Sequence, residues 1–270
     1  MAHRLARFFE YPRLYLLFAG IYFRRVMEYR TDFFLGFGTH LVRSATGLLL
    51  VWTLTNRVQV FRGWSSAEVM LIFGLSVTTT AVANIITVAV SNLGRSYILT
   101  GDLDRLLLRP RNTLFQLLAG HVNEMALGQL VSGFAALDWA FNRLPEFLTP
   151  AHALWLALAV LCGTIIYFSI ILLSVSICFW FELEWGILEI TETLGTLAQY
   201  PLDIYNTAIR FLLTWIVPFG FTAFLPAAAV LRPDEYRVYY YLLPVCTLII
   251  FGAAYTVWKT GLRRYVGAGH

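Results

Sequence analysis

The chain has 270 residues, of which 59% are hydrophobic, 16% aromatic and only 13% charged. This composition excludes a soluble globular protein of this size, because too few polar residues remain to cover its surface. The net charge of +4 comes from arginines and a single lysine, Lys259, which is typical of loops that flank membrane spans and not of a nucleic-acid surface. The sequence therefore predicts an all-α integral membrane protein that does not bind nucleic acid.

The N-terminal region contains an apolar run that is too short to cross a membrane. The run, Leu14 to Phe23, has ten residues, half of the ~20 that a spanning helix needs. No small-residue cleavage site follows it, so it does not match a signal peptide. Pro12 suits the first turn of a helix. We therefore expect residues 12 to 30 to form an interfacial helix on the cytosolic surface.

Six longer apolar segments follow, each near or above the length of a membrane span, although the fifth is marginal. They cover about residues 33 to 56, 67 to 90, 113 to 137, 153 to 181, 204 to 220 and 238 to 258. With the N-terminus in the cytosol, the inner segments 1–32, 91–112, 182–203 and 259–270 carry 6, 4, 0 and 3 Lys or Arg, 13 in all, against 5 in the outer loops. The positive-inside rule therefore favours six spans with both termini cytosolic.

This pattern predicts one multi-pass domain in the plasma (cytoplasmic) membrane, 1–270. Residues 1–32 form its cytosolic or interfacial N-terminal part, 33–258 the six-span bundle and 259–270 a cytosolic tail. Residues 182 to 200 alternate apolar and acidic faces at helical spacing, so we expect a cytosolic amphipathic helix there. Pro218, Pro226 and Pro233 interrupt the next apolar stretch and favour short re-entrant helices on the outer face.

Polar residues follow stripes within the expected spans and make a candidate translocation path. Its members are Ser76, Thr80, Asn84 and Thr87 in the second span and His121 and Glu124 in the third. Arg43 and Arg210 are charges within spans. Such groups turn away from lipid, either to bond neighbouring helices or to line a hydrated route, and both readings stay open. For Glu124, a buried structural pair with His121 and a transport role are equally open.

The sequence lacks the common motifs of catalytic and nucleotide-binding sites. The chain has no GxSxG, HExxH or GxxxxGK[ST] motif, and its single lysine lies at the edge of the last span. The five histidines lack metal-ligand spacing, and the three cysteines form no CxxC pair. We therefore expect neither an enzyme nor a bound metal or cofactor.

Four stretches, taken together, resemble a known family. They are "TGDLDRLLLRP" at 100–110, "YPLDIY" at 200–205, "PFGFTAFLPA" at 218–227 and "RRYVGAG" at 263–269. In this order and on this topology they resemble the permease subunits of ATP-binding-cassette (ABC) exporters of the type-2, six-helix class. The resemblance implies an N-terminal connecting helix, a coupling helix between spans two and three, and outer re-entrant helices before span six.

The resemblance also implies partners. The chain would form half of a translocation path with a second permease, the same or homologous, in the lipid bilayer. Two copies of a separate ATPase subunit would bind ATP and Mg.

The inner loop after the second span is the expected contact with that ATPase. Tyr97, Ile98 and Leu99 offer an apolar plug before Gly101, and charges of both signs surround it. The coupling residues are Arg95, Ser96, Tyr97, Ile98, Leu99, Gly101, Asp102, Asp104 and Arg105. A solvated positive-inside loop is the alternative, and it would explain the arginines but not the apolar cluster.

Two other classes of function remain open. A proton-coupled secondary transporter would use Glu124, His121, Arg43 and Arg210 as a charge relay and would need no ATPase. A membrane scaffold or assembly subunit would need no path at all. Neither the substrate nor the direction of transport follows from the sequence.

Overall fold

The computed structural model describes residues 14–15, 17–18, 20–22, 24, 26, 28, 30–57, 63–145, 149–181 and 184–265. Its longer helices are α2 (Arg30–Arg57), α3 (Ser66–Ser91), α5 (Thr113–Gly120), α6 (Ala126–Phe141), α7 (Pro150–Ser176), α8 (Glu184–Leu197), α10 (Phe224–Leu231) and α12 (Tyr239–Arg264). The shorter elements are the π-helix Leu93–Ile98, α4 (Asp102–Leu107), Ile177–Phe179, Leu202–Ile204, α9 (Thr207–Phe211), Leu212–Ile216, Phe219–Thr222 and α11 (Pro233–Tyr236). The described chain is thus built from helices, as the sequence predicted.

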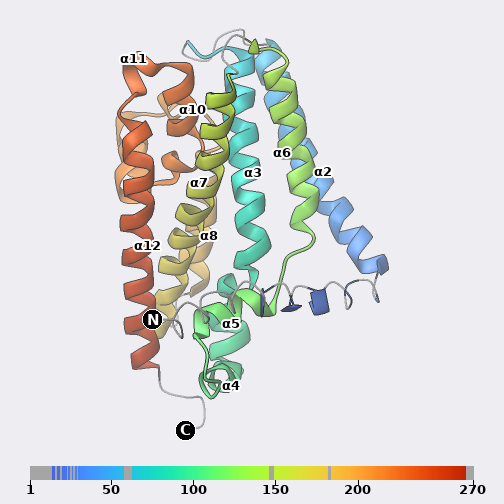
Figure 1. Cartoon of the computed structure of the whole chain (residues 1–270), viewed down its shortest axis with the longest axis vertical. Helices are drawn as coiled ribbons and strands as arrows, with labels where there is room; N and C mark the ends of the chain where they lie inside the picture. The colour runs from blue at the N-terminus through green and yellow to red at the C-terminus, as the bar shows by residue number, and fades with distance from the viewer. Residues whose placement is uncertain are drawn as a thin grey trace.

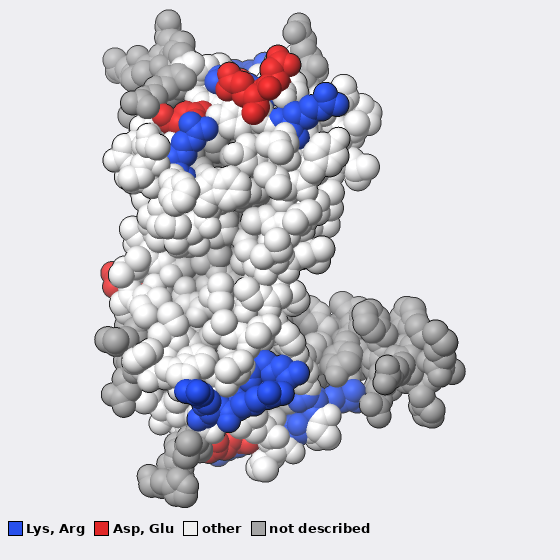
Figure 2. All heavy atoms as spheres, turned by 90° about the vertical axis from the view of Figure 1, so that its left-hand side faces the viewer, with Lys and Arg blue, Asp and Glu red and all other residues white. Residues whose placement is uncertain are grey.

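The long helices run along the longest axis of the molecule (Figure 1). Within the described residues, 4 helices are long and apolar enough to cross a membrane: Arg30–Thr53, Ser66–Ser91, Pro150–Phe179 and Tyr239–Arg264. On the face shown in Figure 2, charged side chains gather at the two ends of the molecule, and the surface between them is almost uncharged. We call the end with α11 the upper end and the end with α4 the lower end (Figure 1). This distribution is that of a multi-pass membrane protein.

The buried centre of the bundle is α3, which packs between α6 and α7. Small residues allow these close approaches. A Cβ on Gly133 of α6 would lie 2.5 Å from Thr78 Oγ1, and one on Gly163 of α7 would lie 2.9 Å from Thr79 Cγ2. At the upper end α3 begins with a capping box, in which Ser65 and Glu68 each accept a hydrogen bond from the other's backbone N–H. α3 is therefore capped at its upper end and covered on two sides by neighbouring helices.

The third expected span, 113 to 137, is not one helix. α5 ends at Gly120, His121 is extended with φ −142° and ψ 131°, and α6 begins at Ala126. The Asn123 N–H donates to the Ile85 carbonyl oxygen of α3 at 2.9 Å. This bond satisfies a backbone donor that the break would otherwise leave unpaired. The expectation of a continuous span was therefore wrong.

The prediction that residues 204 to 220 form the fifth membrane span is also wrong. The helical part of this segment, Thr207–Ile216, is too short to cross a membrane, since ten helical residues extend only about 15 Å. The chain instead passes from the lower to the upper end through α8. Phe179, before α8, packs on Trp258 near the lower end of α12. Asp203, after α8, bonds Trp64 and Tyr236 at the upper end.

Residues 207 to 231 then enter the bundle from the upper end and return to it. The Thr79 hydroxyl donates to the Thr222 carbonyl oxygen at 3.3 Å. Thr79 lies about 20 Å along α3 from Ser66, so the segment reaches deep into the molecule. All residues of α10 are buried. Short re-entrant helices were expected in this part of the chain, and the structure extends them to include residues first assigned to the fifth span.

The described residues between Leu14 and Glu28 are helical and run crosswise at the lower end of the molecule (Figure 1). This direction agrees with the expected interfacial helix, whose position in the membrane surface stays a prediction. The remaining residues of 1–28, together with Glu182 and Leu183 of the expected amphipathic helix, lie outside the described residues.

Candidate translocation groove and coupling surface

A polar groove of about 420 Å³ runs along one side of α3. α3 lines it from Phe73 to Ser91, about 27 Å of helix. α2 and α8 supply further lining residues, and α6, α7 and the break before α6 add one each. The polar and charged lining comprises His40, Arg43, Ser44, Thr80, Asn84, Thr87, Ser91, Asn123, Gln129, Tyr167, Glu192, Thr196 and Gln199.

The groove offers many hydrogen-bonding groups and both signs of charge. Arg43 of α2 and Glu192 of α8 are electrostatic neighbours, and no direct ion pair joins them in the described structure. The Asn84 Nδ2 donates to Gln129 Oε1 at 3.4 Å, a long bond that leaves capacity for other partners. Such groups cost free energy when they face hydrocarbon unpaired. The groove therefore requires water, a solute or another protein surface beside it.

The structure brings together part of the predicted path. Thr80, Asn84 and Thr87 line the groove together with Arg43. Ser76 is buried and does not line it. His121, Glu124 and Arg210 also lie outside the groove.

Sequence reasoning missed the contribution of α8. Glu192 and Thr196 of its polar face line the groove, together with Gln199 just after its end. Ile187 and Leu194 of its apolar face line a second cavity of about 670 Å³ beside α12. The amphipathic pattern was recognised correctly, but its polar side was assigned to the cytosol. Gln129 and Tyr167 were also missed, and isolated polar residues in apolar runs gave no periodic signal.

His121 and Glu124, whose pairing was one of two open alternatives, contact other residues in the described structure. The Tyr22 hydroxyl donates to Glu124 Oε2 at 2.8 Å, so that carboxylate is tied to the N-terminal helical residues. His121 Nδ1 lies 3.2 Å from the Tyr97 hydroxyl oxygen, within hydrogen-bonding distance. Both residues sit at the break between α5 and α6, near the lower end. The break therefore connects the N-terminal residues with the loop after α3.

That loop is the predicted coupling segment, and it forms a compact turn at the lower end. A π-helix, Leu93–Ile98, is followed by Gly101 with φ 74°, a left-handed conformation that favours glycine, and then by α4. Leu103 of α4 is buried and anchors the turn. Arg105 pairs with Asp102 at 3.1 Å, but with side-chain exposures of 82% and 46% the pair contributes little stability.

The exposed apolar residues of this turn differ from those expected. Tyr97 and Ile98 are half-buried against the core, and burial, followed by the charge of Asp102, raises the pKa of Tyr97. Leu99 is 77% exposed and Leu108 is 86% exposed. Tyr97 and Ile98 are therefore less exposed than expected, and the role of the three residues in coupling stays a prediction. The surface available to a partner is made by leucines on either side of α4.

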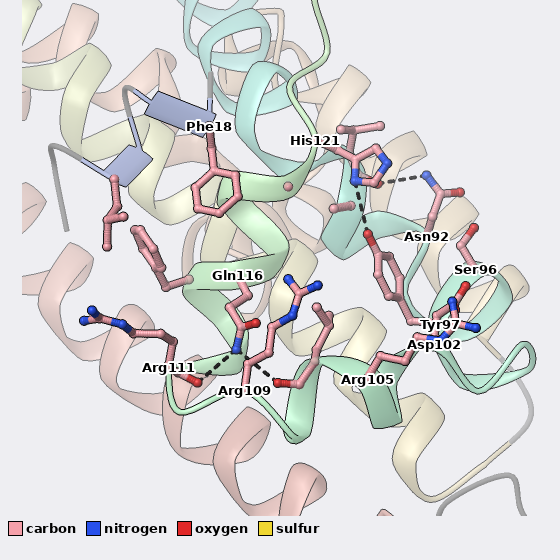
Figure 3. Close-up of a pocket in the computed structure, with 16 residues that line it drawn as sticks. Phe18, Asn92, Ser96, Tyr97, Asp102, Arg105, Arg109, Arg111, Gln116 and His121 are labelled. Carbon is pink, nitrogen blue, oxygen red and sulfur yellow. Dashed lines mark hydrogen bonds and ion pairs between the residues drawn. The ribbon is translucent and has the colours of Figure 1, made fainter. Parts of the chain in front are cut away.

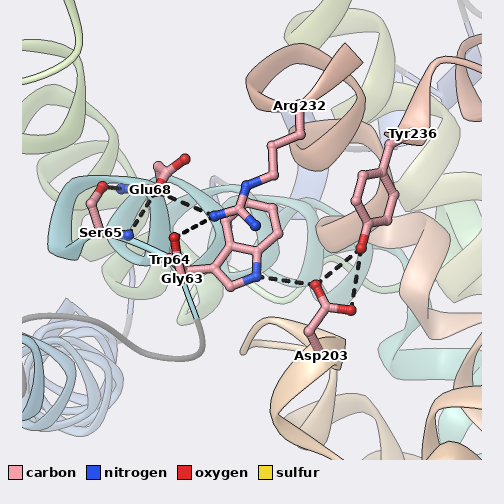
Figure 4. Close-up of polar contacts among 7 residues, drawn as sticks. All are labelled: Gly63, Trp64, Ser65, Glu68, Asp203, Arg232 and Tyr236. Atoms are coloured by element: carbon pink, nitrogen blue, oxygen red, sulfur yellow. Dashed lines mark hydrogen bonds and ion pairs between the residues drawn. The ribbon is translucent and has the colours of Figure 1, made fainter. Parts of the chain in front are cut away.

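A polar network joins the re-entrant segment to the start of α3 at the upper end (Figure 4). Asp203 accepts hydrogen bonds from Trp64 Nε1 at 3.1 Å and from the Tyr236 hydroxyl at 3.0 Å, and it pairs with Arg210 at 2.8 Å. The Arg232 guanidinium stacks 3.6 Å above the Trp64 ring and donates to the Gly63 carbonyl oxygen. Arg210, expected as a charge within a span, is thus a partner of Asp203 at the upper end.

The family model for "ABC-2 family transporter protein" matches residues 41–269. The match covers most of the chain, including the groove, the coupling turn and the re-entrant segment. Together with the membrane architecture it defines the class, a permease of an ABC-type transporter. The chain belongs to the ABC-2 transporter family, and the predicted resemblance is confirmed.

Permeases of this family are generally non-catalytic and associate with an ABC ATPase. Comparisons with curated proteins and with solved structures gave no match.

Proposed function

We propose that the chain is the membrane subunit of an ABC exporter in the plasma membrane, with the polar groove as its half of the translocation path. The observation that supports this most is the groove itself, whose lining along α3 includes Thr80, Asn84, Thr87 and Ser91 in a chain that is 59% hydrophobic. Lipid acyl chains cannot supply hydrogen-bonding or charged partners for the side chains of Arg43 and Glu192. A second permease, identical or homologous, would close the open side and complete the path.

The position of the groove along α3 supports transport from the cytosol to the outside. Its lining begins at Ser91, the last residue of α3 at the lower end, and reaches Phe73 in the upper half of that helix. Above it lie the buried re-entrant helices and the network around Asp203. With the lower end in the cytosol, as the arginine distribution favours, a solute would enter from the side where ATP is available.

The coupling turn is the proposed contact with a separate ATPase, present in two copies in the complex and binding ATP and Mg. Leu99 and Leu108 would enter an apolar cleft, with Asp102, Asp104 and Arg105 at its rim. The bond between Tyr97 and His121 would pass movement of the turn to the break before α6.

A labelling experiment tests this function without knowledge of the substrate. In a chain whose three native cysteines are replaced by alanine, Thr80→Cys, at a half-buried position that lines the groove, would be treated with a membrane-impermeant thiol reagent from the cytosolic side. We expect labelling in the complex without nucleotide and at least a severalfold change when ATP is added, because closure of the path alters access to the groove. Ser76→Cys, buried on the same helix, is the matched control and should stay unlabelled.

The other outcomes distinguish the alternatives. A response of Thr80→Cys to a proton gradient, but not to ATP, would point to a secondary transporter. Equal labelling at both positions, unchanged by ATP or a gradient, would leave no path and favour a scaffold.

A further inference from the structure

A third pocket, of about 700 Å³, lies at the lower end, apart from the groove and from the cavity beside α12 (Figure 3). Its apolar lining comes from the N-terminal helical residues Leu14 and Phe18, from the end of α3, and from Phe115 of α5. Three arginines also line it: Arg105, Arg109 and Arg111. Apolar walls beside several cations indicate a ligand that is apolar at one end and anionic at the other.

Arg109 is the cation best placed to bind such a ligand. Its guanidinium points into the pocket (Figure 3). Among the described residues, no ion pair or hydrogen bond occupies this side chain. By contrast, Arg105 already has Asp102 as a partner. The charge of Arg109 is therefore available inside the pocket.

The loop that carries Arg109 is held in place from behind by Gln116. Its Nε2 donates to the Leu106 carbonyl oxygen at 3.1 Å and to the Arg111 carbonyl oxygen at 3.0 Å, on either side of Arg109 (Figure 3). The Oε1 atom of the same amide is buried and has no hydrogen-bond partner in the described structure. A buried acceptor without a donor costs free energy, and a ligand hydroxyl would remove that cost.

The pocket also lies at the height expected for lipid headgroups. On the face shown in Figure 2, Lys and Arg side chains gather at the lower end, beneath an almost uncharged middle. The exposed basic side chains at the lower end include Arg109, Arg111, Lys259, Arg263 and Arg264. The Asn112 Nδ2 donates to the Tyr255 hydroxyl at 3.1 Å, which places the loop against α12.

We propose that this pocket binds an anionic phospholipid of the inner leaflet. Arg109 binds the phosphate in a charge-assisted contact, a headgroup hydroxyl donates to Gln116 Oε1, and the acyl chains leave along Leu14 and Phe18. The exposed leucines of the coupling turn, Leu99 and Leu108, do not line the pocket. Asp102 and Arg105 line the pocket and also stand at the rim of the proposed ATPase contact. The lipid and the ATPase would therefore bind adjoining parts of the same loop, and the bound lipid would stabilise the loop between the N-terminal residues and α5.

The test uses the full-length permease alone in a zwitterionic detergent, with short-chain phosphatidylglycerol as the probe and native mass spectrometry or calorimetry as the readout. Wild type should prefer phosphatidylglycerol to phosphatidylcholine of the same chain length. Arg109→Gln should weaken phosphatidylglycerol binding by about tenfold or more, because it removes a charged hydrogen-bonding partner. Arg263→Gln, an equal loss of charge at the same end but outside the pocket, should change it by less than about twofold.

Several results would overturn the proposal. Equal losses in the two variants would mean that general attraction to the basic side chains of the lower end explains binding. Displacement of the lipid by millimolar inorganic phosphate would mean that the site recognises a free anion. An absence of lipid selectivity in wild type, together with loss of ATPase co-purification in Arg109→Gln, would assign Arg109 to the subunit interface.

Discussion

At the scale of single residues, Asp203 determines how the upper end is held together. Its carboxylate contacts donors from three separate parts of the chain: Trp64 before α3, Arg210 in α9 and Tyr236 in α11. The side chain is only 18% exposed. A buried carboxylate is tolerated when several donors satisfy it, and removal of one donor costs more than the average hydrogen bond contributes. Asp203 therefore fixes both ends of the re-entrant segment to α3.

Tyr236→Phe tests this network. The variant should lower the free energy of unfolding in detergent by about 1–2 kcal/mol near neutral pH, because Asp203 loses a buried donor. Burial, followed by the charge and hydrogen bond of Asp203, raises the pKa of Tyr236 from 10.0 to about 12. A raised pKa means that the folded state favours the protonated hydroxyl, so its contribution is complete below pH 10 and is lost as the pH rises through 12.

Stability should be measured by thermal or denaturant unfolding between pH 7 and 12. The difference between wild type and Tyr236→Phe should shrink over the last two pH units. Tyr241→Phe, at a tyrosine that is 70% exposed on α12, is the control and should have no effect at any pH. A constant difference across the range would contradict the assigned role of the hydroxyl.

At the scale of helices, α8 shows what a periodic pattern can and cannot predict. The spacing of Ile187, Ile190 and Leu194 correctly predicted an amphipathic helix. It did not say which polar environment the other face meets, because a wet groove and the cytosol favour the same residue types. Residues 182–203 contain no Lys or Arg, so the positive-inside rule gave no information about their side.

The break in the third span illustrates another limit. Between α5 and α6 there is no proline, and Gly120 is the only residue that disfavours a helix strongly. Hydropathy therefore predicted one continuous span. The break is stabilised by tertiary bonds from Asn123, His121 and Glu124 to segments far away in the chain. Such bonds are absent from any local pattern.

The coupling turn yields a prediction at this scale. Leu99→Ser combined with Leu108→Ser should reduce co-purification of the ATPase by about tenfold or more, because two exposed apolar contacts are lost from a small interface. The permease should still insert and fold, since neither leucine packs in the core. Leu154→Ser, an exposed leucine near the start of α7, controls for a general effect on solubility.

Tyr97→Ala is a less direct test than the double leucine variant, because it would also break the contact with His121 and loosen the turn itself. Unchanged ATPase binding and unchanged ATP turnover in the double leucine variant would remove the turn from the interface.

At the scale of the whole molecule, the topology can be stated as a route between the two ends. We propose six crossing segments: α2, α3, α5 with α6, α7, α8 and α12. The number agrees with the expectation from the sequence, but the fifth segment is α8 and not 204–220. The count of inner and outer Lys and Arg changes little between the two topologies, because only Arg210 is reassigned, from a span to the outer side. The re-entrant segment is consequently longer than the prolines alone indicated.

Cysteine labelling of Thr207 decides between the two topologies. Thr207 begins α9 and is exposed, four residues after Asp203. If the chain crosses in α8, Thr207→Cys should react with an impermeant thiol reagent from the same side as Arg143→Cys, at the upper end after α6, and from the side opposite to Arg105→Cys in the coupling turn. If the chain crosses at 204–220, Thr207 lies at the inner end of that span and should share the side of Arg105→Cys. The three native cysteines are replaced by alanine in all variants, so that each reaction reports one position. Protection of Thr207→Cys from the outside, with Arg143→Cys fully reactive there, would reject the α8 crossing and with it the placement of Glu192, Thr196 and Gln199 in the groove.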